Sequence, residues 1–234
     1  MTLNVSGGIY PGHENLLLMM HARNYNTYLN DLIKTAAPRG GHILDFGAGV
    51  GALAESGKLW ADRLTCVEMD LVQLGILRSK GFTAIPSLES VPDGSIDFIY
   101  CINVLEHIKD DLDVLLNLRQ KIVNGGTLLL YVPAFRFLFS QMDVAVGHYR
   151  RYEKADLASL LKTAGFEVDK IRFVDFLGVF ATLAYKAVGQ KDGGINLNAL
   201  KFYDKFLFPL SRNLDKLFDS LVGKNLLVIA KKNG

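Results

Sequence analysis

The alternation of short apolar runs with helix-forming segments predicts an α/β fold built on a mostly parallel sheet. The first run, residues 42–46, leads straight into a turn with three glycines and then into a helix-forming segment. A second run, residues 64–68, ends in an acidic residue, and helical patterns separate it from later runs at residues 82–85, 127–133 and 166–173. Strands that are connected through helices in this way favour parallel pairing.

Length and composition indicate one globular domain over residues 1–234, because 50% of the residues are hydrophobic and 21% are charged. A formal net charge of +2 is too small to indicate a nucleic-acid partner. Cys66 and Cys101 lie within apolar runs without a Cys-x-x-Cys pattern or a histidine cluster, so we expect buried thiols and no metal site. The amino-terminal residues do not read as a signal peptide, and a cytoplasmic location is the default expectation.

The segment before the first strand predicts a helical cover over residues 1–40. Residues 1–12 are glycine-rich and read as irregular, whereas apolar residues between 13 and 37 recur at helical spacing. The sequence Pro-Arg-Gly-Gly at residues 38–41 ends this pattern before the strand begins.

The glycine turn predicts a site for a nucleotide-like ligand, because glycine permits close approach of the backbone and the following helix start offers free N–H donors. Gly47, Gly49 and Ala52 fit a dinucleotide pattern, whereas Gly47, Gly49 and Gly51 with Asp45 fit a second pattern, acid-x-Gly-x-Gly-x-Gly. Glu68 lies 21 residues after Gly47, the separation at which a carboxylate accepts hydrogen bonds from ribose hydroxyls. The turn and Glu68 alone suit NAD and S-adenosylmethionine equally.

The segment after residue 96 distinguishes between NAD and S-adenosylmethionine as the ligand. Five of its residues match a strand-to-helix pattern with correct mutual spacing: Asp97, Asn103, Leu105, Glu106 and His107. Together with the glycine turn, this stretch resembles the class I S-adenosylmethionine-dependent methyltransferases, in particular methyltransferase domains of type 11/12. The resemblance covers about residues 42–133, and NAD-dependent dehydrogenases do not share it.

The resemblance implies a Rossmann-like, seven-stranded sheet whose last strand, residues 225–230, is antiparallel. It also implies S-adenosylmethionine as cofactor, S-adenosylhomocysteine as product, and methyl transfer to an O or N nucleophile of a small-molecule acceptor such as a sugar, a lipid-linked intermediate or a natural product. The loop after the third strand lacks the usual acid, so a backbone group or Ser87 could replace it. The expected cofactor-binding residues are Asp45, Gly47, Ala48, Gly49, Gly51, Glu68, Met69, Leu88 and Asn103.

Residues 134–153 form an aromatic and basic loop that the resemblance places over the methyl donor. His148 is the candidate catalytic residue, because an imidazole can take a proton from an attacking hydroxyl or amine near neutral pH. The alternative is that the loop is locked shut by these residues and that Asp143 pairs with an arginine. The expected acceptor-binding residues are Tyr10, Tyr25, Arg150, Arg151 and Tyr152.

Residues 176–222 predict a helical insertion before the last strand, rich in aromatic residues and interrupted at Pro209. Its apolar surface needs a partner. A lid over the acceptor and a homodimer interface are equal interpretations, and peripheral membrane contact ranks third. Two other functions remain open from sequence: a non-catalytic S-adenosylmethionine-binding module, and a nicotinamide-dependent oxidoreductase.

Overall fold

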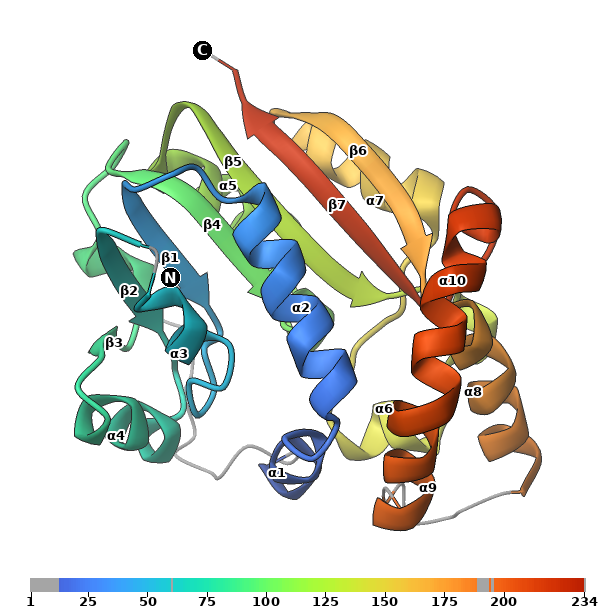
Figure 1. Cartoon of the computed structure of the whole chain (residues 1–234). Helices are drawn as coiled ribbons and strands as arrows, with labels where there is room; N and C mark the ends of the chain where they lie inside the picture. Colours follow the sequence, from blue (N-terminus) through green and yellow to red (C-terminus); the bar gives the residue numbers. More distant parts are fainter. Residues whose placement is uncertain (1–12, 60, 189–193, 195, 234) are drawn as a thin grey trace.

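The computed structural model, which describes residues 13–59, 61–188, 194 and 196–233, shows a sheet of seven strands in the order β3-β2-β1-β4-β5-β7-β6 (Figure 1). β7 is antiparallel to both of its neighbours, and the first five strands pair in parallel. The predicted fold, including the antiparallel last strand, is therefore confirmed. The strands are β1 (His42–Phe46), β2 (Arg63–Val67), β3 (Thr83–Ile85), β4 (Ile96–Ile102), β5 (Ile122–Pro133), β6 (Phe166–Val174) and β7 (Asn225–Lys232).

The helices follow the predicted order with small shifts at their ends. The helix after the glycine turn is short, because the turn runs through Gly51 at a φ of +83°, which a helix does not contain, and α3 begins only after it. The helices are α1 (His13–Met19), α2 (Arg23–Ala36), α3 (Ala54–Gly57), α4 (Leu71–Ser79), α5 (Asp111–Lys121), α6 (Gln141–Ala145), α7 (Lys154–Thr163), α8 (Phe176–Val188), α9 (Leu197–Phe202) and α10 (Phe208–Phe218), with single turns η1 (Leu88–Ser90), η2 (Leu105–His107), η3 (Arg136–Leu138) and η4 (Tyr203–Leu207).

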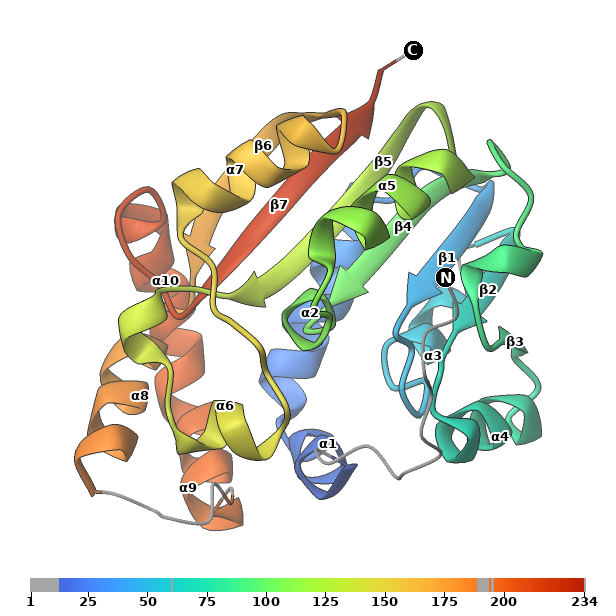
Figure 2. The same ribbon diagram turned by 180° about the vertical axis from the view of Figure 1, so that it is seen from behind.

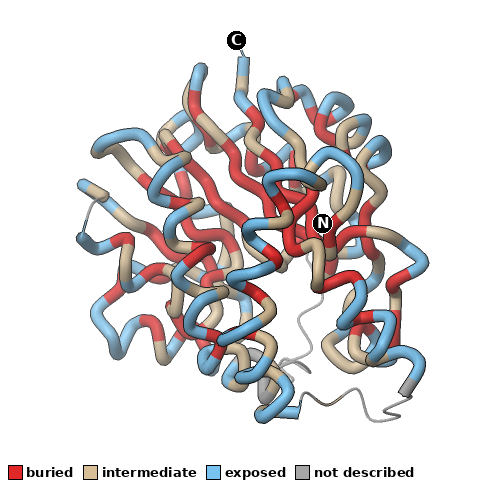
Figure 3. Tube along the Cα trace, turned by 45° about the vertical axis from the view of Figure 1, so that its right-hand side comes forward, coloured by how far each residue is buried: buried red, intermediate tan, exposed pale blue. Residues whose placement is uncertain are grey.

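Helices cover both faces of the sheet, and the pleat sorts the strand residues between them. Successive residues of a strand point to opposite faces. On β1, Ile43 packs in one core cluster with Ile33 of α2, whereas Leu44 packs in the other with Leu115 of α5. Figures 1 and 2 show α2 and α10 on one side and α5 and α7 on the other. The central strands are accordingly buried along most of their length (Figure 3).

The helical insertion is attached to the rest of the fold by buried carboxylates. Asp204, in the π-helical turn η4, accepts hydrogen bonds from the backbone N–H groups of Asn24 and Tyr25 at the start of α2. Asp215 of α10 accepts from the N–H groups of Asp175 and Phe176 at the start of α8. The helical backbone runs on through Pro209, which lies in the first turn of α10, and the departure from α-helical hydrogen bonding is the π-helical turn η4 just before it.

The loops that follow β1, β4 and β5 leave the sheet at the same edge, where α1, α6 and α9 also lie (Figures 1 and 2). In open α/β sheets, ligands bind in the crevice beyond the carboxyl ends of the strands. Among the described residues, no helix combines the length and the apolar character needed to cross a bilayer.

Candidate active site

The glycine turn is folded back onto β2. The N–H groups of Gly47 and Ala48 both donate to the carbonyl of Val67, at 2.9 and 3.1 Å. Gly47 has a φ of +78°, and a Cβ placed on it would lie 2.4 Å from Cγ2 of Val104. The turn therefore requires glycine at this position for both backbone conformation and space.

Glu68 follows β2 and organises the turn. Its Oε2 accepts a hydrogen bond from the N–H of Gly49 at 2.8 Å, and its Oε1 accepts from the N–H of Asp70 at 2.9 Å. Burial raises the pKa of Glu68, and the two backbone hydrogen bonds oppose that rise. Each carboxylate oxygen has two lone pairs, so each can still accept from a ribose hydroxyl. Glu68 can hold the turn and the cofactor together.

The remaining predicted adenine contacts flank Glu68. Met69 is 44% exposed and adjoins it in the chain. The N–H of Glu68 donates to the carbonyl of Ile85 at 3.0 Å, so the loop after β3, which carries Leu88 in η1, runs beside it. Ser87 accepts a hydrogen bond from the N–H of Glu89 through its hydroxyl oxygen, and thus caps η1.

Asp45 lies at the end of β1 beneath the turn. The side chain is only 4% exposed, and among the described residues its Oδ2 has no hydrogen-bond partner. Burial raises the pKa of Asp45 to about 7. A buried carboxyl oxygen without a partner is costly unless a ligand supplies one. The ammonium group at the methionine end of the expected cofactor would be such a partner.

Asn103 and Tyr25, predicted for the cofactor and the acceptor, meet in the structure. The amide of Asn103 donates to the Tyr25 hydroxyl at 3.3 Å, and Asn103 has a left-handed φ of +53°. Tyr25 packs edge-on against Tyr131 of β5 and Phe208 of α10. This contact joins α2, the end of β4 and the insertion at one point. Tyr10 lies outside the described residues.

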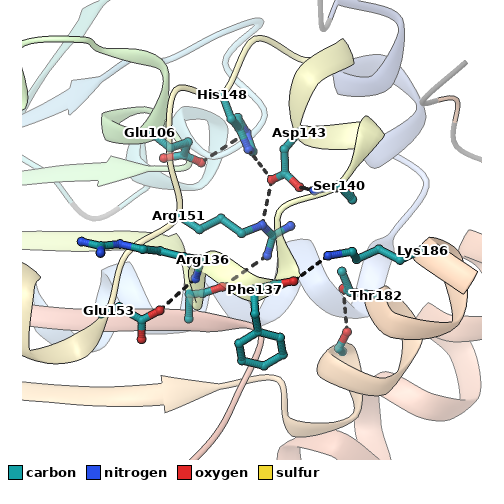
Figure 4. A network of polar contacts seen from close by, with 12 residues as sticks. Glu106, Arg136, Phe137, Ser140, Asp143, His148, Arg151, Glu153, Thr182 and Lys186 are labelled. Atoms are coloured by element: carbon teal, nitrogen blue, oxygen red, sulfur yellow. Dashed lines mark hydrogen bonds and ion pairs between the residues drawn. The ribbon is translucent and has the colours of Figure 1, made fainter. Parts of the chain in front are cut away.

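A buried polar network occupies the loop after β5 (Figure 4). His148 Nδ1 lies 2.8 Å from Oδ1 of Asp143, and Nε of Arg151 donates to the same oxygen at 2.8 Å. The N–H and the hydroxyl of Ser140 both donate to Oδ2 of Asp143. Burial alone would raise the pKa of Asp143, but His148 and Arg151 together hold it well below its ordinary value.

Glu106 faces this network from η2. It is fully buried, and His148 Nε2 lies 3.7 Å from its Oε1. Burial raises the pKa of Glu106 to about 8. The ring of His107 meets that of His148 edge to face, with centroids 4.5 Å apart, and burial lowers the pKa of His107 to about 4.

The structure places the other predicted acceptor residues in contacts within the protein. Arg151 is 6% exposed and held by Asp143. The guanidinium of Arg150 donates to the carboxylate of Asp111 and to the carbonyl of Lys109. The Tyr152 hydroxyl donates to Asp111 at 3.0 Å. The pairing of Asp143 with an arginine, the alternative drawn from sequence, is therefore present.

Sequence reasoning did not assign Glu106 or Ser140 to the site, and it gave Asp143 only as the partner of an arginine. One signal was available in the sequence. Ser140 and Asp143 form a capping box at the start of α6, which is visible as Ser-x-x-Asp. Glu106 stands in the Leu-Glu-His match, but its burial against a loop some 40 residues away is not readable from that match.

Comparison with known proteins agrees with this geometry. A ubiquinone biosynthesis O-methyltransferase of Xanthomonas axonopodis pv. citri is 26% identical over 157 residues, which cover 57% of this chain and 66% of that protein. A probable S-adenosylmethionine-dependent methyltransferase of Mycolicibacterium smegmatis is 32% identical over 112 residues, which cover 47% of this chain and 41% of that protein. The chain thus spans just under two thirds of the first relative and about two fifths of the second.

A solved structure of a methyltransferase from Thermotoga maritima, described as S-adenosylmethionine-dependent and a possible histamine N-methyltransferase, shares the fold. Its TM-score is 0.65 at 16% identity, over 94% of this chain and 95% of that chain. The family model of the methyltransferase domain matches residues 21–171, well over half of the chain. The protein is therefore a member of the class I S-adenosylmethionine-dependent methyltransferase family, and S-adenosylmethionine is its cofactor.

Proposed function

We propose that this protein transfers the methyl group of S-adenosylmethionine to an oxygen or nitrogen nucleophile of a small-molecule acceptor. The observation that carries the proposal is the meeting of three predicted cofactor groups at the carboxyl ends of β1, β2 and β4: the glycine turn, Glu68 and Asn103. In this arrangement Asp45 serves the methionine end of the cofactor and Glu68 serves the ribose. The names of the relatives that are O-methyltransferases support an oxygen acceptor.

The acceptor would enter beside Asn103 and Tyr25, and the buried rings of Tyr131 and Phe208 support Tyr25 from behind. Methyl transfer from a sulfonium needs in-line positioning of the nucleophile more than acid–base help. The Tyr25 hydroxyl, held by Asn103, is placed to orient an acceptor through a hydrogen bond. His148 stays a predicted base. Asp143 holds its Nδ1, and its Nε2 lies 3.7 Å from the buried Glu106.

The first test is calorimetric binding of S-adenosylmethionine and of NAD to the wild type, Glu68→Ala and Glu55→Ala. Loss of the ribose hydrogen bonds should weaken S-adenosylmethionine binding at least tenfold in Glu68→Ala, about 1.4 kcal/mol. Glu55, on the surface of α3, is the matched control and should bind as the wild type does. Tighter binding of NAD, or equal affinities in all three proteins, would refute the proposed cofactor site.

The second test is turnover with methyl-labelled S-adenosylmethionine against a panel of phenols, catechols, sugars and amines. Labelled product from any acceptor supports methyltransferase activity, and the class of that acceptor shows whether oxygen or nitrogen is methylated. Binding without turnover on the whole panel would favour the non-catalytic module instead. His148→Asn, assayed on the same acceptor, tests the predicted base: a base requires a lower kcat that is restored in part at higher pH.

The role of the insertion is a separate prediction. Its helices expose large apolar side chains, among them Phe180, Phe202, Phe206 and Leu217, each more than half exposed. Such a surface supports either a lid over the acceptor or contact with a second copy of the chain. Sedimentation velocity over a range of concentrations distinguishes the two, since a lid leaves the protein monomeric at every concentration.

A further inference from the structure

Three atoms that could bind a metal ion lie close together beside the polar network. They belong to Glu106, His107 and His148, and they all lie within 4.8 Å of one another. A tetrahedral zinc ion bound at about 2.0–2.2 Å holds its ligand atoms roughly 3.3–3.6 Å apart. His148 Nε2 and Glu106 Oε1 are already 3.7 Å apart, so the main adjustment on binding is a movement of His107 toward this pair by about 1 Å. Two imidazoles and one carboxylate are a donor set that zinc uses in catalytic sites, with the fourth position open.

Glu106 supplies a second, independent observation. Its carboxylate is fully buried, and neither oxygen has a hydrogen-bond partner within the described part of the chain. Burial of a carboxylate without compensation is strongly unfavourable, and a bound cation is one of the arrangements that removes the penalty. The carboxylate faces His148 Nε2, the direction from which an ion would bind.

The ring of His148 is held in an orientation that suits metal binding. Asp143 holds Nδ1 at 2.8 Å, and Arg151 and Ser140 fix Asp143 in turn (Figure 4). A carboxylate on one ring nitrogen directs the lone pair of the other nitrogen outward, which is the arrangement of histidines that bind metals. Here the other nitrogen, Nε2, points toward Glu106.

His107 is fixed from the same loop. The backbone at Gly147 and Val146 hydrogen-bonds to its ring. An imidazole has two nitrogens, so a backbone hydrogen bond on one is compatible with coordination by the other. Access is available, because His107 is half-buried and the side chain of His148 is 14% exposed.

We propose that Glu106, His107 and His148 form a binding site for one divalent transition-metal ion such as Zn²⁺, with Asp143 as the outer partner of His148. The sequence indicated no metal site, because the two histidines are 41 residues apart and only the fold brings them together. The proposed metal binding requires neither the cofactor nor the acceptor. In the metal-bound protein Nε2 of His148 is a ligand, so His148 is then not the base.

The test uses tag-free protein stripped with a chelator, without cofactor or acceptor. Calorimetry should show one Zn²⁺ per chain, and Glu106→Gln and His148→Asn should each weaken binding at least tenfold. His21→Asn is the control for binding at a surface histidine, since His21 is exposed and lies outside the cluster. It should bind as the wild type does.

Co²⁺ titration of the wild type gives a readout that does not depend on the folding of any variant. The visible spectrum should show the intense bands of four-coordinate cobalt with nitrogen and oxygen ligands. Absence of these bands, absence of stoichiometric Zn²⁺ binding, or unchanged binding in Glu106→Gln would each overturn the proposal. None of these results depends on methyl transfer, so the site can fail while the proposed function stands.

Discussion

Gly47 lies where the chain turns out of β1, at a φ of +78° and with Val104 in the place that a side chain would occupy. Gly47→Ala must therefore adopt a strained backbone conformation and displace Val104, which precedes η2. We expect the free energy of unfolding to fall by about 1–3 kcal/mol and S-adenosylmethionine binding to weaken at least tenfold. Urea unfolding and calorimetry measure the two effects.

Gly75→Ala is the matched control for that substitution. Gly75 lies within α4, and a Cβ placed there would meet no atom within 4 Å. Alanine in place of glycine inside a helix stabilises by up to about 1 kcal/mol, so this variant should be slightly more stable and bind the cofactor normally. If Gly47→Ala behaved in the same way as Gly75→Ala, the steric account of the turn would be wrong.

At the residue scale, sequence predicts best the groups whose function depends on local spacing. Gly47, Glu68 and Asn103 were identified because the motif and its strand-to-strand distances reflect the local path of the backbone. Glu106 was not assigned a role, because its role arises when the loop after β5 packs against η2. Asp143 was expected only as the partner of an arginine, and its contact with His148 was not foreseen. Burial of that kind depends on contacts between distant segments.

The amino terminus of α2 shows how a whole element depends on a distant one. Its own N-cap residue, Ala22, provides no side-chain cap, and Asp204 instead accepts from the N–H groups of Asn24 and Tyr25 at 3.0 and 2.9 Å. The carboxylate is 6% exposed and also lies favourably at the positive end of the helix dipole. Tyr25, which contacts Asn103, is positioned by this cap.

Asp204→Ala should lower the free energy of unfolding by about 1–3 kcal/mol, because two part-buried N–H groups lose their acceptor. It should also speed amide hydrogen exchange at Asn24 and Tyr25. Asn196→Ala is the comparison, because Asn196 is an exposed, local N-cap of α9. Its loss should lower the free energy of unfolding by about 1 kcal/mol. Exchange at Asn24 and Tyr25 that stayed as slow as in the wild type would refute the role of Asp204.

At the element scale, the strands and the antiparallel direction of the last one followed from apolar runs and the family resemblance. The predicted helical insertion over residues 176–222 was found, and it begins with α8 at residues 176–188. The attachment of the insertion to α2 could not be predicted, because Asp204 and Asn24 are 180 residues apart. A cap supplied across such a distance leaves no local pattern in the sequence.

The stability of the whole molecule should depend on pH through the carboxyl buried beneath the glycine turn. Burial raises the pKa of Asp45 to about 7, against about 3.9 in an unfolded chain. Between these values the folded state binds more protons than the unfolded state, so the free energy of unfolding falls as the pH rises from about 4 to 7. A difference of three pKa units corresponds to a loss of up to about 4 kcal/mol.

Asp45→Asn removes this contribution, since the amide stays neutral at every pH and has nearly the same shape. Urea unfolding of both proteins at intervals from pH 4 to pH 8 isolates it, because the other titrating groups are common to both chains and cancel in the difference. Relative to the wild type, the variant should gain stability as the pH rises to about 7 and no more above it. The same variant should bind S-adenosylmethionine more weakly, since it no longer offers a charge to the cofactor's ammonium group. A difference that stayed constant across the whole range would show that the Asp45 carboxyl ionises in the folded protein as readily as in the unfolded chain.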